Sequence, residues 1–292
     1  MPPARLLHKA SSLGGRRPGT AATVPELAAL RARVRQIEQN RAAGGSCASS
    51  LPRTLDIPGI EPALQPPALA PAAFQEVVPA SAKDRPAAAA FALALLRQLL
   101  QSAEENPEET PEKRATLPLL WCQTAVEAKD FGRLYPPGLM PWGLAPGRLL
   151  LVEASRDKDI LWAMEEGLRS AALAAVVGEL GAGGLGTASL TATRRLALAA
   201  QQSGCPCLLL RNGDRGASAA RTRWRIAGAP SRPGPLDPRA PGEPSWRAEL
   251  VRCPQGRPAA WTLEWSHETD SFHLAAAVVD RPLAARRMHR VA

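Results

Sequence analysis

The chain has 292 residues, of which 45% are hydrophobic, which is enough for one sizeable folded domain with further segments at its ends. No apolar run approaches the roughly 18 residues that cross a membrane, so we expect no membrane contact. The net charge of +9 is unevenly placed: residues 1–50 carry eight basic and two acidic residues, and residues 281–292 carry four arginines and no acid. Basic ends beside a mildly acidic body fit contact with nucleic acid or an acidic partner, and they equally fit a solubilising tail.

Residues 1–22 read as a basic tail, rich in arginine and serine and free of acidic residues. This composition is typical of a mitochondrial transit peptide and also of a disordered bacterial tail. We favour the disordered tail because of the segments that follow in the chain.

Residues 23–72 are predicted to form an amphipathic helix followed by a proline-rich linker. Thr23 and Glu26 have the spacing of a capping box at the start of the helix. The apolar residues Leu27, Leu30, Val34 and Ile37 then recur at helical spacing. Such a helix either docks on the body or binds a partner. Residues 41–72 follow as the linker.

Residues 73–280 alternate between apolar strands and amphipathic helices. Strands are predicted at 74–78, 117–124, 148–154, 173–180 and 207–211, and helices at 85–101, 157–170 and 191–203. Asp84 is a plausible cap for the first of these helices. Continuous apolar strands that alternate with helices predict a mainly parallel sheet with helices on both faces, which is a three-layer α/β domain.

After Arg211 the hydrophobic period changes from helical to two, which predicts half-buried strands at 221–226, 246–250 and 261–265. We expect these to be antiparallel strands that extend the sheet. Arg221, Arg223 and Arg225 share one face of the first of them. This arginine face either contacts a nucleic-acid backbone or an acidic partner protein, or it is a solvated face whose charges prevent edge-to-edge pairing of sheets. Arg286 and Arg287, in the basic tail at 281–292, are further candidates for DNA or partner contact.

The junction between the first strand and helix, at 77–86, is where a nucleotide-binding domain would carry its phosphate loop. Such a loop needs glycines that bring N–H groups to the phosphates, a lysine, and a hydroxyl for magnesium. This junction supplies only Lys83, with Asp84 at the hydroxyl position and Pro86 lacking an N–H. Glu179, at the end of a buried strand, is the best candidate for a magnesium carboxylate, although we favour the reading that it is a polar residue that ends a strand.

Other catalytic patterns are also missing from the sequence. The histidines are His8, His267, His273 and His289, and none belongs to a nucleophile elbow or an H-E-x-x-H motif. The five cysteines include only one close pair, Cys205 and Cys207, without the spacing of a zinc site. We therefore expect reduced thiols in a cytosolic protein, with no catalytic residue, no metal and no cofactor.

Several segments resemble the ImuA family, which are bacterial RecA-like accessory proteins of damage-induced mutagenesis that are also related to SulA. The resemblance covers roughly residues 70–266. Its carrying segments include LYPPGL at 134–139, DKDILWAMEEGLRS at 157–170, TATRRLALAAQQSG at 191–204 and ARTRWRIAGAPS at 220–231.

The resemblance implies a RecA-like domain at 73–280 in which Lys83 and Asp84 occupy a degenerate phosphate loop and Glu179 a vestigial magnesium position. It further implies a non-catalytic role in SOS mutagenesis and translesion synthesis, at the nucleoid in the bacterial cytoplasm. The implied direct partner is an ImuB-like polymerase protein, with RecA, an error-prone polymerase and DNA as further candidates. Two alternatives stay open: a weak ATPase that uses Lys83 and Glu179, and a regulator of RecA filaments.

Overall fold

The computed structural model describes residues 5–7, 72–104, 116–170, 172–181, 188–213, 216–233, 240–253 and 258–275. The helix predicted at 23–40, most of the linker and the basic tail at 281–292 lie outside the described residues, and so do Arg286 and Arg287. The predictions for those segments therefore stay predictions.

One ten-stranded sheet runs through the molecule, in the order β1-β4-β3-β5-β6-β2-β7-β8-β9-β10. Its six strands from β4 to β7 are parallel, whereas β1 at one edge and β8 to β10 at the other pair antiparallel. The strands are β1 (Arg5–Leu7), β2 (Phe74–Pro79), β3 (Leu119–Thr124), β4 (Leu149–Ala154), β5 (Ala175–Leu180), β6 (Cys207–Arg211), β7 (Thr222–Gly228), β8 (Ser245–Arg252), β9 (Ala259–Ser266) and β10 (Ser271–Leu274).

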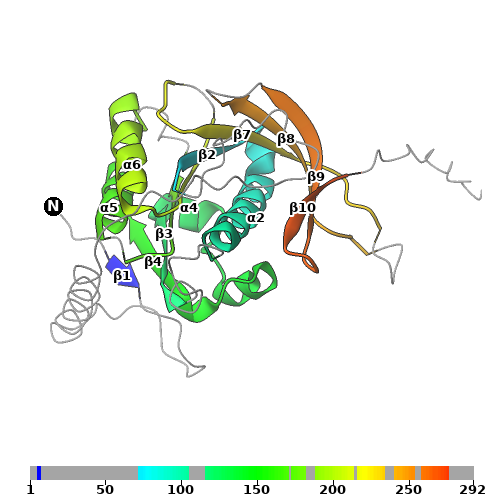
Figure 1. The fold of residues 1–292 in the computed structure, drawn as a ribbon, viewed down its shortest axis with the longest axis horizontal. Helices are drawn as coiled ribbons and strands as arrows, with labels where there is room; N and C mark the ends of the chain where they lie inside the picture. The colour runs from blue at the N-terminus through cyan, green and yellow to red at the C-terminus, as the bar shows by residue number, and fades with distance from the viewer. Residues whose placement is uncertain are drawn as a thin grey trace, which may run out of the picture.

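Helices cover both faces of this sheet, so that the domain has three layers (Figure 1). α2 lies on one face, and α5 and α6 lie side by side on the other. The helices are α2 (Arg85–Glu104), α4 (Ala125–Asp130), α5 (Asp157–Ser170) and α6 (Leu190–Ser203), with short 3-10 turns η1 (Ala82–Asp84), η2 (Pro136–Trp142) and η3 (Pro146–Arg148). The predicted α/β fold, RecA-like with a mainly parallel sheet and antiparallel strands on the C-terminal side, is confirmed.

Two hydrophobic cores lie on opposite faces of the sheet, one under α2 and one under α5 and α6. The strands between them are buried from both faces, as β2, β3 and β6 are along their whole length. This double burial explains why β6 is an almost continuous apolar run and why the polar side chains of β2, Gln75 and Glu76, are fully buried. In the first core, the centroid of the Phe91 ring of α2 lies 5.6 Å from the centroid of the Trp224 ring and 5.3 Å from that of the Phe272 ring.

The direction of β7 differs from the prediction. The strand expected at 221–226 forms, but it pairs parallel with β2 instead of antiparallel. The physical reason is the connection after β6, which crosses the α6 side of the sheet, where the Ala219 N–H donates to Thr193 Oγ1 of α6. The chain re-enters the sheet beside the start of β2, where the Arg221 N–H donates to the Phe74 carbonyl oxygen over 2.8 Å.

Three short elements have no counterpart in the prediction. α4 follows β3 directly, β10 completes the antiparallel edge, and β1 lies within the tail expected at 1–22. β1 forms the edge of the sheet and pairs antiparallel with β4, with Arg5 opposite Glu153. Among the described residues, no helix is long and apolar enough to span a membrane. The cysteines within the described ranges, Cys122, Cys205, Cys207 and Cys253, are buried.

Candidate functional site

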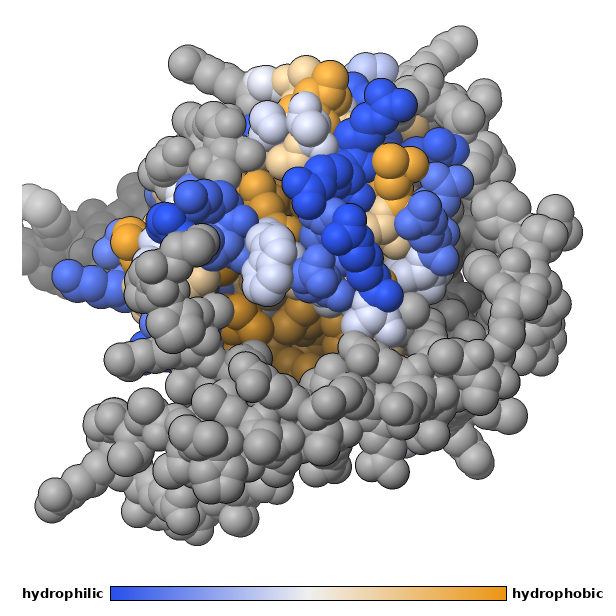
Figure 2. Space-filling view, turned by 90° about the vertical axis from the view of Figure 1, so that its left-hand side faces the viewer, coloured by the Kyte–Doolittle hydropathy of each residue, from blue (hydrophilic) through white to orange (hydrophobic). Residues whose placement is uncertain are grey.

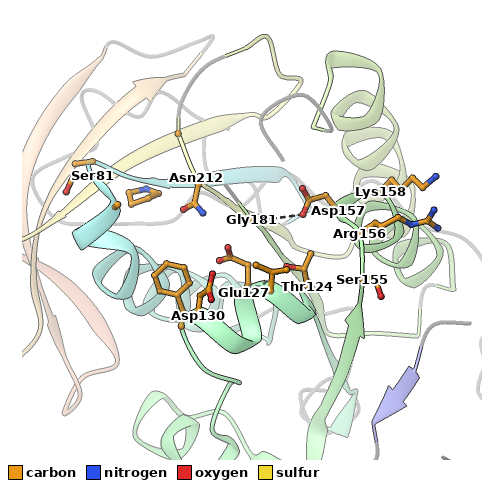
Figure 3. A pocket seen from close by; sticks show the side chains of 16 residues that line it. Ser81, Thr124, Glu127, Asp130, Ser155, Arg156, Asp157, Lys158, Gly181 and Asn212 are labelled. Carbon is orange, nitrogen blue, oxygen red and sulfur yellow. Dashed lines mark hydrogen bonds between the residues drawn. The ribbon is translucent and has the colours of Figure 1, made fainter. Parts of the chain in front are cut away.

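A cleft of about 830 Å³ opens where the parallel strands end. The last residues of β2 and β3, and the residues that follow β4, β5 and β6, contribute to its lining (Figure 3). The crevice at the carboxyl ends of parallel strands is where open α/β sheets bind ligands. The position of this cleft therefore makes it the candidate functional site.

Arg85, the first residue of α2, lies buried beside this cleft with a side chain that is only 2% exposed. Its Nη2 donates to Glu127 Oε2 over 2.5 Å and to Glu179 Oε2 over 2.8 Å. Its Nε donates to Glu127 Oε2 over 3.1 Å. One guanidinium thus holds two carboxylates that come from distant parts of the chain, and these three residues are called the Arg85 cluster below.

Local structure places each member of the Arg85 cluster. The chain leaves β2, turns through η1 and enters α2, which sets Arg85 at the junction between strand and helix. Thr124 caps α4 by accepting a hydrogen bond from the Glu127 N–H over 3.2 Å, so Glu127 lies in the first helical turn. Glu179 lies near the end of β5, where its Oε1 accepts from Trp121 Nε1 of β3 over 2.5 Å.

The electrostatics of the Arg85 cluster are dominated by burial. Burial raises the pKa of the Glu179 carboxyl, and the charge of Glu127 raises it further, while the charge of Arg85 and the Trp121 hydrogen bond oppose the rise. The cation of the cluster is already bound to two carboxylates of the protein itself, so it is not available to hold a phosphate.

No family model matches the chain. Two proteins named Protein ImuA, from two strains of Caulobacter vibrioides, are each 36% identical to it over 171 residues, which is 54% of this chain and 68% of each relative. The chain belongs to the ImuA family. The resemblance seen in the sequence is thereby confirmed, and it gives the chain a role in the mutagenesis that follows DNA damage.

In this ImuA-family domain neither predicted residue of the degenerate phosphate loop, Lys83 or Asp84, lines the cleft. Lys83 is exposed in η1, and the cleft is lined by its neighbours Ser81 and Ala82 instead. Asp84 accepts hydrogen bonds from Ser81 Oγ over 2.5 Å and from the Gly228 N–H over 3.1 Å, and the Ser81 bond is the main cause of its lowered pKa. Asp84 therefore ties η1 to the end of β7. Glu179 is the predicted site residue that the structure brings into the cluster.

The predicted arginine face divides into residues with different surroundings. Arg223 is buried, and its Nε donates to Glu76 Oε2 of β2 over 2.6 Å. Glu76 also binds Arg211 Nη1 at 3.1 Å and accepts from Ser218 Oγ at 2.9 Å. Arg225 pairs with Glu249 at 3.0 Å and stays partly exposed, as does Arg221. Contact of this face with DNA stays a prediction, and Arg223 has a structural partner inside the domain.

Arg85 and Glu127 are the site residues that sequence reasoning missed. A usable signal existed for Glu127, because Thr124 and Glu127 have the S/T-x-x-E spacing of a capping box directly after a strand. Arg85 had only a weak signal, as a charged residue at the start of an alanine- and leucine-rich helix. Its burial depends on Glu127 and Glu179, which lie 42 and 94 positions further along the chain.

Proposed function

We propose that this chain is a non-catalytic accessory protein of SOS mutagenesis. In this role it links an ImuB-type, Y-family-like polymerase protein and an error-prone polymerase to damaged DNA. Its membership of the ImuA family supports a role in the mutagenesis that follows DNA damage. The Arg85 cluster supports the absence of catalysis and is the observation that carries the proposal.

A nucleotide phosphate and its magnesium need a free cation and free carboxylates at the ends of the parallel strands, whereas the Arg85 cluster, which lies there, pairs its charges with one another. Magnesium is held by carboxylate oxygens, and in this cleft the carboxylates of Glu127 and Glu179 are bound by a guanidinium. The loop from Pro79 to Pro86 contains no glycine that would let backbone N–H groups close on phosphate oxygens. Releasing the carboxylates from Arg85 would leave buried charges without a partner, and an unpaired charge is energetically costly in the low-dielectric interior.

Nucleotide titration tests the non-catalytic half of the proposal. The full chain is titrated with a fluorescent ATP analogue in the presence of Mg²⁺, and phosphate release from ATP is followed in parallel. We expect no saturable binding and no hydrolysis above the buffer rate. Micromolar affinity that the substitution Lys83→Ala abolishes would instead establish the weak ATPase.

Co-purification tests the adaptor half independently. The full chain is co-expressed with the ImuB-type protein of its own organism and, separately, with RecA. We expect a stable complex with the ImuB-type protein that does not require nucleotide. A chain that fails to bind ImuB yet caps or disassembles RecA filaments on single-stranded DNA would establish the filament regulator instead. Deleting residues 281–292 shows whether the basic tail carries the contact.

A further inference from the structure

α5 and α6 form one continuous outer face of the domain, on the side of the sheet opposite to α2 (Figure 1). Glu165 of α5, which is only 6% exposed, forms ion pairs with Arg195 of α6 at 2.6 Å and with Arg169 of α5. The ion pair between Glu165 and Arg195 fixes which sides of the two helices meet. It therefore also fixes which residues flank the seam between them on the solvent side.

Helical spacing places a tryptophan and basic residues along this seam. Lys158, Trp162 and Arg169 are four and seven residues apart, so they share one face of α5, next to the side that carries Glu165. On α6, Leu198 follows Arg195 by one turn and lies beside it. The residues that flank the seam, called the α5–α6 surface below, are Lys158, Trp162, Arg169, Arg194, Arg195 and Leu198.

The α5–α6 surface exposes large apolar side chains at its centre. Trp162 is 58% exposed and Leu198 is 49% exposed, although both lie on helices that bury an apolar stripe on the other side. Figure 2 shows this face of the molecule, with hydrophilic side chains gathered over it and apolar ones between them. A solvent-exposed tryptophan ringed by long polar side chains has the composition of an interface hot spot.

The charge of this surface is positive. Of its four cations, Arg169 pairs with Glu165 and Glu166, and Arg195 pairs with Glu165. Among the described residues no ion pair is formed by Lys158 of α5 or Arg194 of α6, and both are exposed. An occupant of this surface must therefore present negative charge beside an apolar anchor.

We propose that the α5–α6 surface is the docking site for an acidic, amphipathic segment of a partner protein, whose apolar residues cover Trp162 and Leu198 and whose carboxylates meet Lys158 and Arg194. Helical segments of this kind bind grooves between helices through anchors at i, i+3 and i+7. The surface lies on the face of the sheet opposite to α2, and Lys158 at one end of it also lines the cleft.

A protein segment fits this surface better than single-stranded nucleic acid does. Sequence-tolerant binding of single strands relies on several aromatic platforms along a basic groove. Trp162 is the exposed aromatic residue here, and the exposed carboxylate of Glu166 lies one turn away on the same helix. The Glu166 carboxylate would repel a phosphate backbone at that position. An acidic protein segment avoids this repulsion by placing one uncharged polar residue opposite Glu166.

The test uses fluorescence anisotropy on the full chain with two labelled helical peptides of about 18 residues. Both peptides carry leucines at every third or fourth position, and the remaining positions are glutamate in one peptide and lysine in the other. We expect the acidic peptide to bind and the basic one not to bind. Trp162→Ala should weaken binding about tenfold, and Lys158→Glu combined with Arg194→Glu should weaken it further in a salt-dependent manner.

Two matched variants outside the surface control for the general effects of charge and aromatic surface. Tyr135→Ala removes an aromatic side chain that is 70% exposed, and Arg247→Glu reverses an exposed cation on β8. Both should leave the affinity unchanged. The proposal is overturned if neither peptide binds, if Trp162→Ala has no effect, or if only oligo(dT) binds in a Trp162-dependent manner, which would make the surface a nucleic-acid site.

Discussion

Arg85 Nη2 donates to Glu179 Oε2 over 2.8 Å, although the two residues lie 94 positions apart in the chain. The contact joins the start of α2 to the end of β5, across the cleft end of the sheet. The ion pair joins two elements through charges of the protein itself. Losing either partner would leave a buried charge unpaired, which destabilises a folded domain, and that consequence can be measured.

Replacing Arg85 with methionine should destabilise the domain severely. Methionine fills a similar volume but leaves the carboxylates of Glu127 and Glu179 buried without their cation. Removing one partner of a buried ion pair costs about 3–5 kcal/mol. Urea denaturation followed by circular dichroism measures the change in the free energy of unfolding.

The matched control for this substitution is Lys83→Met, two residues earlier in the chain. Lys83 is exposed, so its loss should change the free energy of unfolding by no more than about 0.5 kcal/mol. Equal effects of the two substitutions would contradict the structural role of the Arg85 cluster.

Arg223 and Arg225 should differ sharply in their contributions to stability, although they lie two residues apart on β7. Arg223→Met removes a cation from the fully buried Glu76, which keeps only Arg211 and Ser218, and should cost about 2–3 kcal/mol. Arg225→Met removes a pair whose partners are 34% and 43% exposed, and should cost about 0–1 kcal/mol. The two variants are compared in the same urea titration. A larger loss for Arg225 would refute this assignment.

The elements that sequence alone predicted well are those whose signal is local. The helix over Asp157–Ser170 and the strand over Cys207–Arg211 match the structure residue for residue. In each case an apolar pattern is bounded by clear end signals, such as the two aspartates in the first turn of α5. By contrast, α4 has only six residues, which is too short for a helical period to be recognised.

The features that sequence alone could not predict depend on contacts between distant residues. A period of two identifies β7 as a strand, but the pattern is the same for parallel and antiparallel pairing with β2. Likewise, three alternating arginines look equivalent in the sequence, yet Arg223 is buried because Glu76 lies opposite it on β2. The Arg85 cluster is of the same kind, since its three members come from α2, α4 and β5. Glu179 alone was predicted, from its place at a strand end.

The substitution Glu179→Gln should change how stability depends on pH. Burial raises the pKa of Glu179 in the folded state above its ordinary value of 4.5. The folded protein therefore holds a proton on this carboxyl that the unfolded chain has already lost, so this group's contribution to stability is present at low pH and is lost as pH rises through the folded pKa.

Urea titrations of the wild type and of Glu179→Gln across the range from neutral to acidic pH isolate this contribution. The difference in free energy of unfolding should move in favour of the wild type as the pH falls. Its slope should not exceed about 1.4 kcal/mol per pH unit, which corresponds to one proton. A difference that moves in favour of the variant would mean that the charge of Arg85 outweighs burial at this carboxyl.

Gly178→Ala should destabilise the domain by overfilling the core between β5 and α5. A Cβ at Gly178 would overlap the Sδ and Cε atoms of Met164, which is fully buried on α5. Forcing an extra methyl group into a packed core costs about 1–3 kcal/mol. Gly138→Ala is the matched control, because its Cβ would meet only the Tyr135 ring, at an ordinary contact distance of 3.4 Å. Thermal unfolding of both variants measures the difference. Combining Gly178→Ala with Met164→Val should restore part of the loss, since a shorter side chain leaves room for the new methyl group.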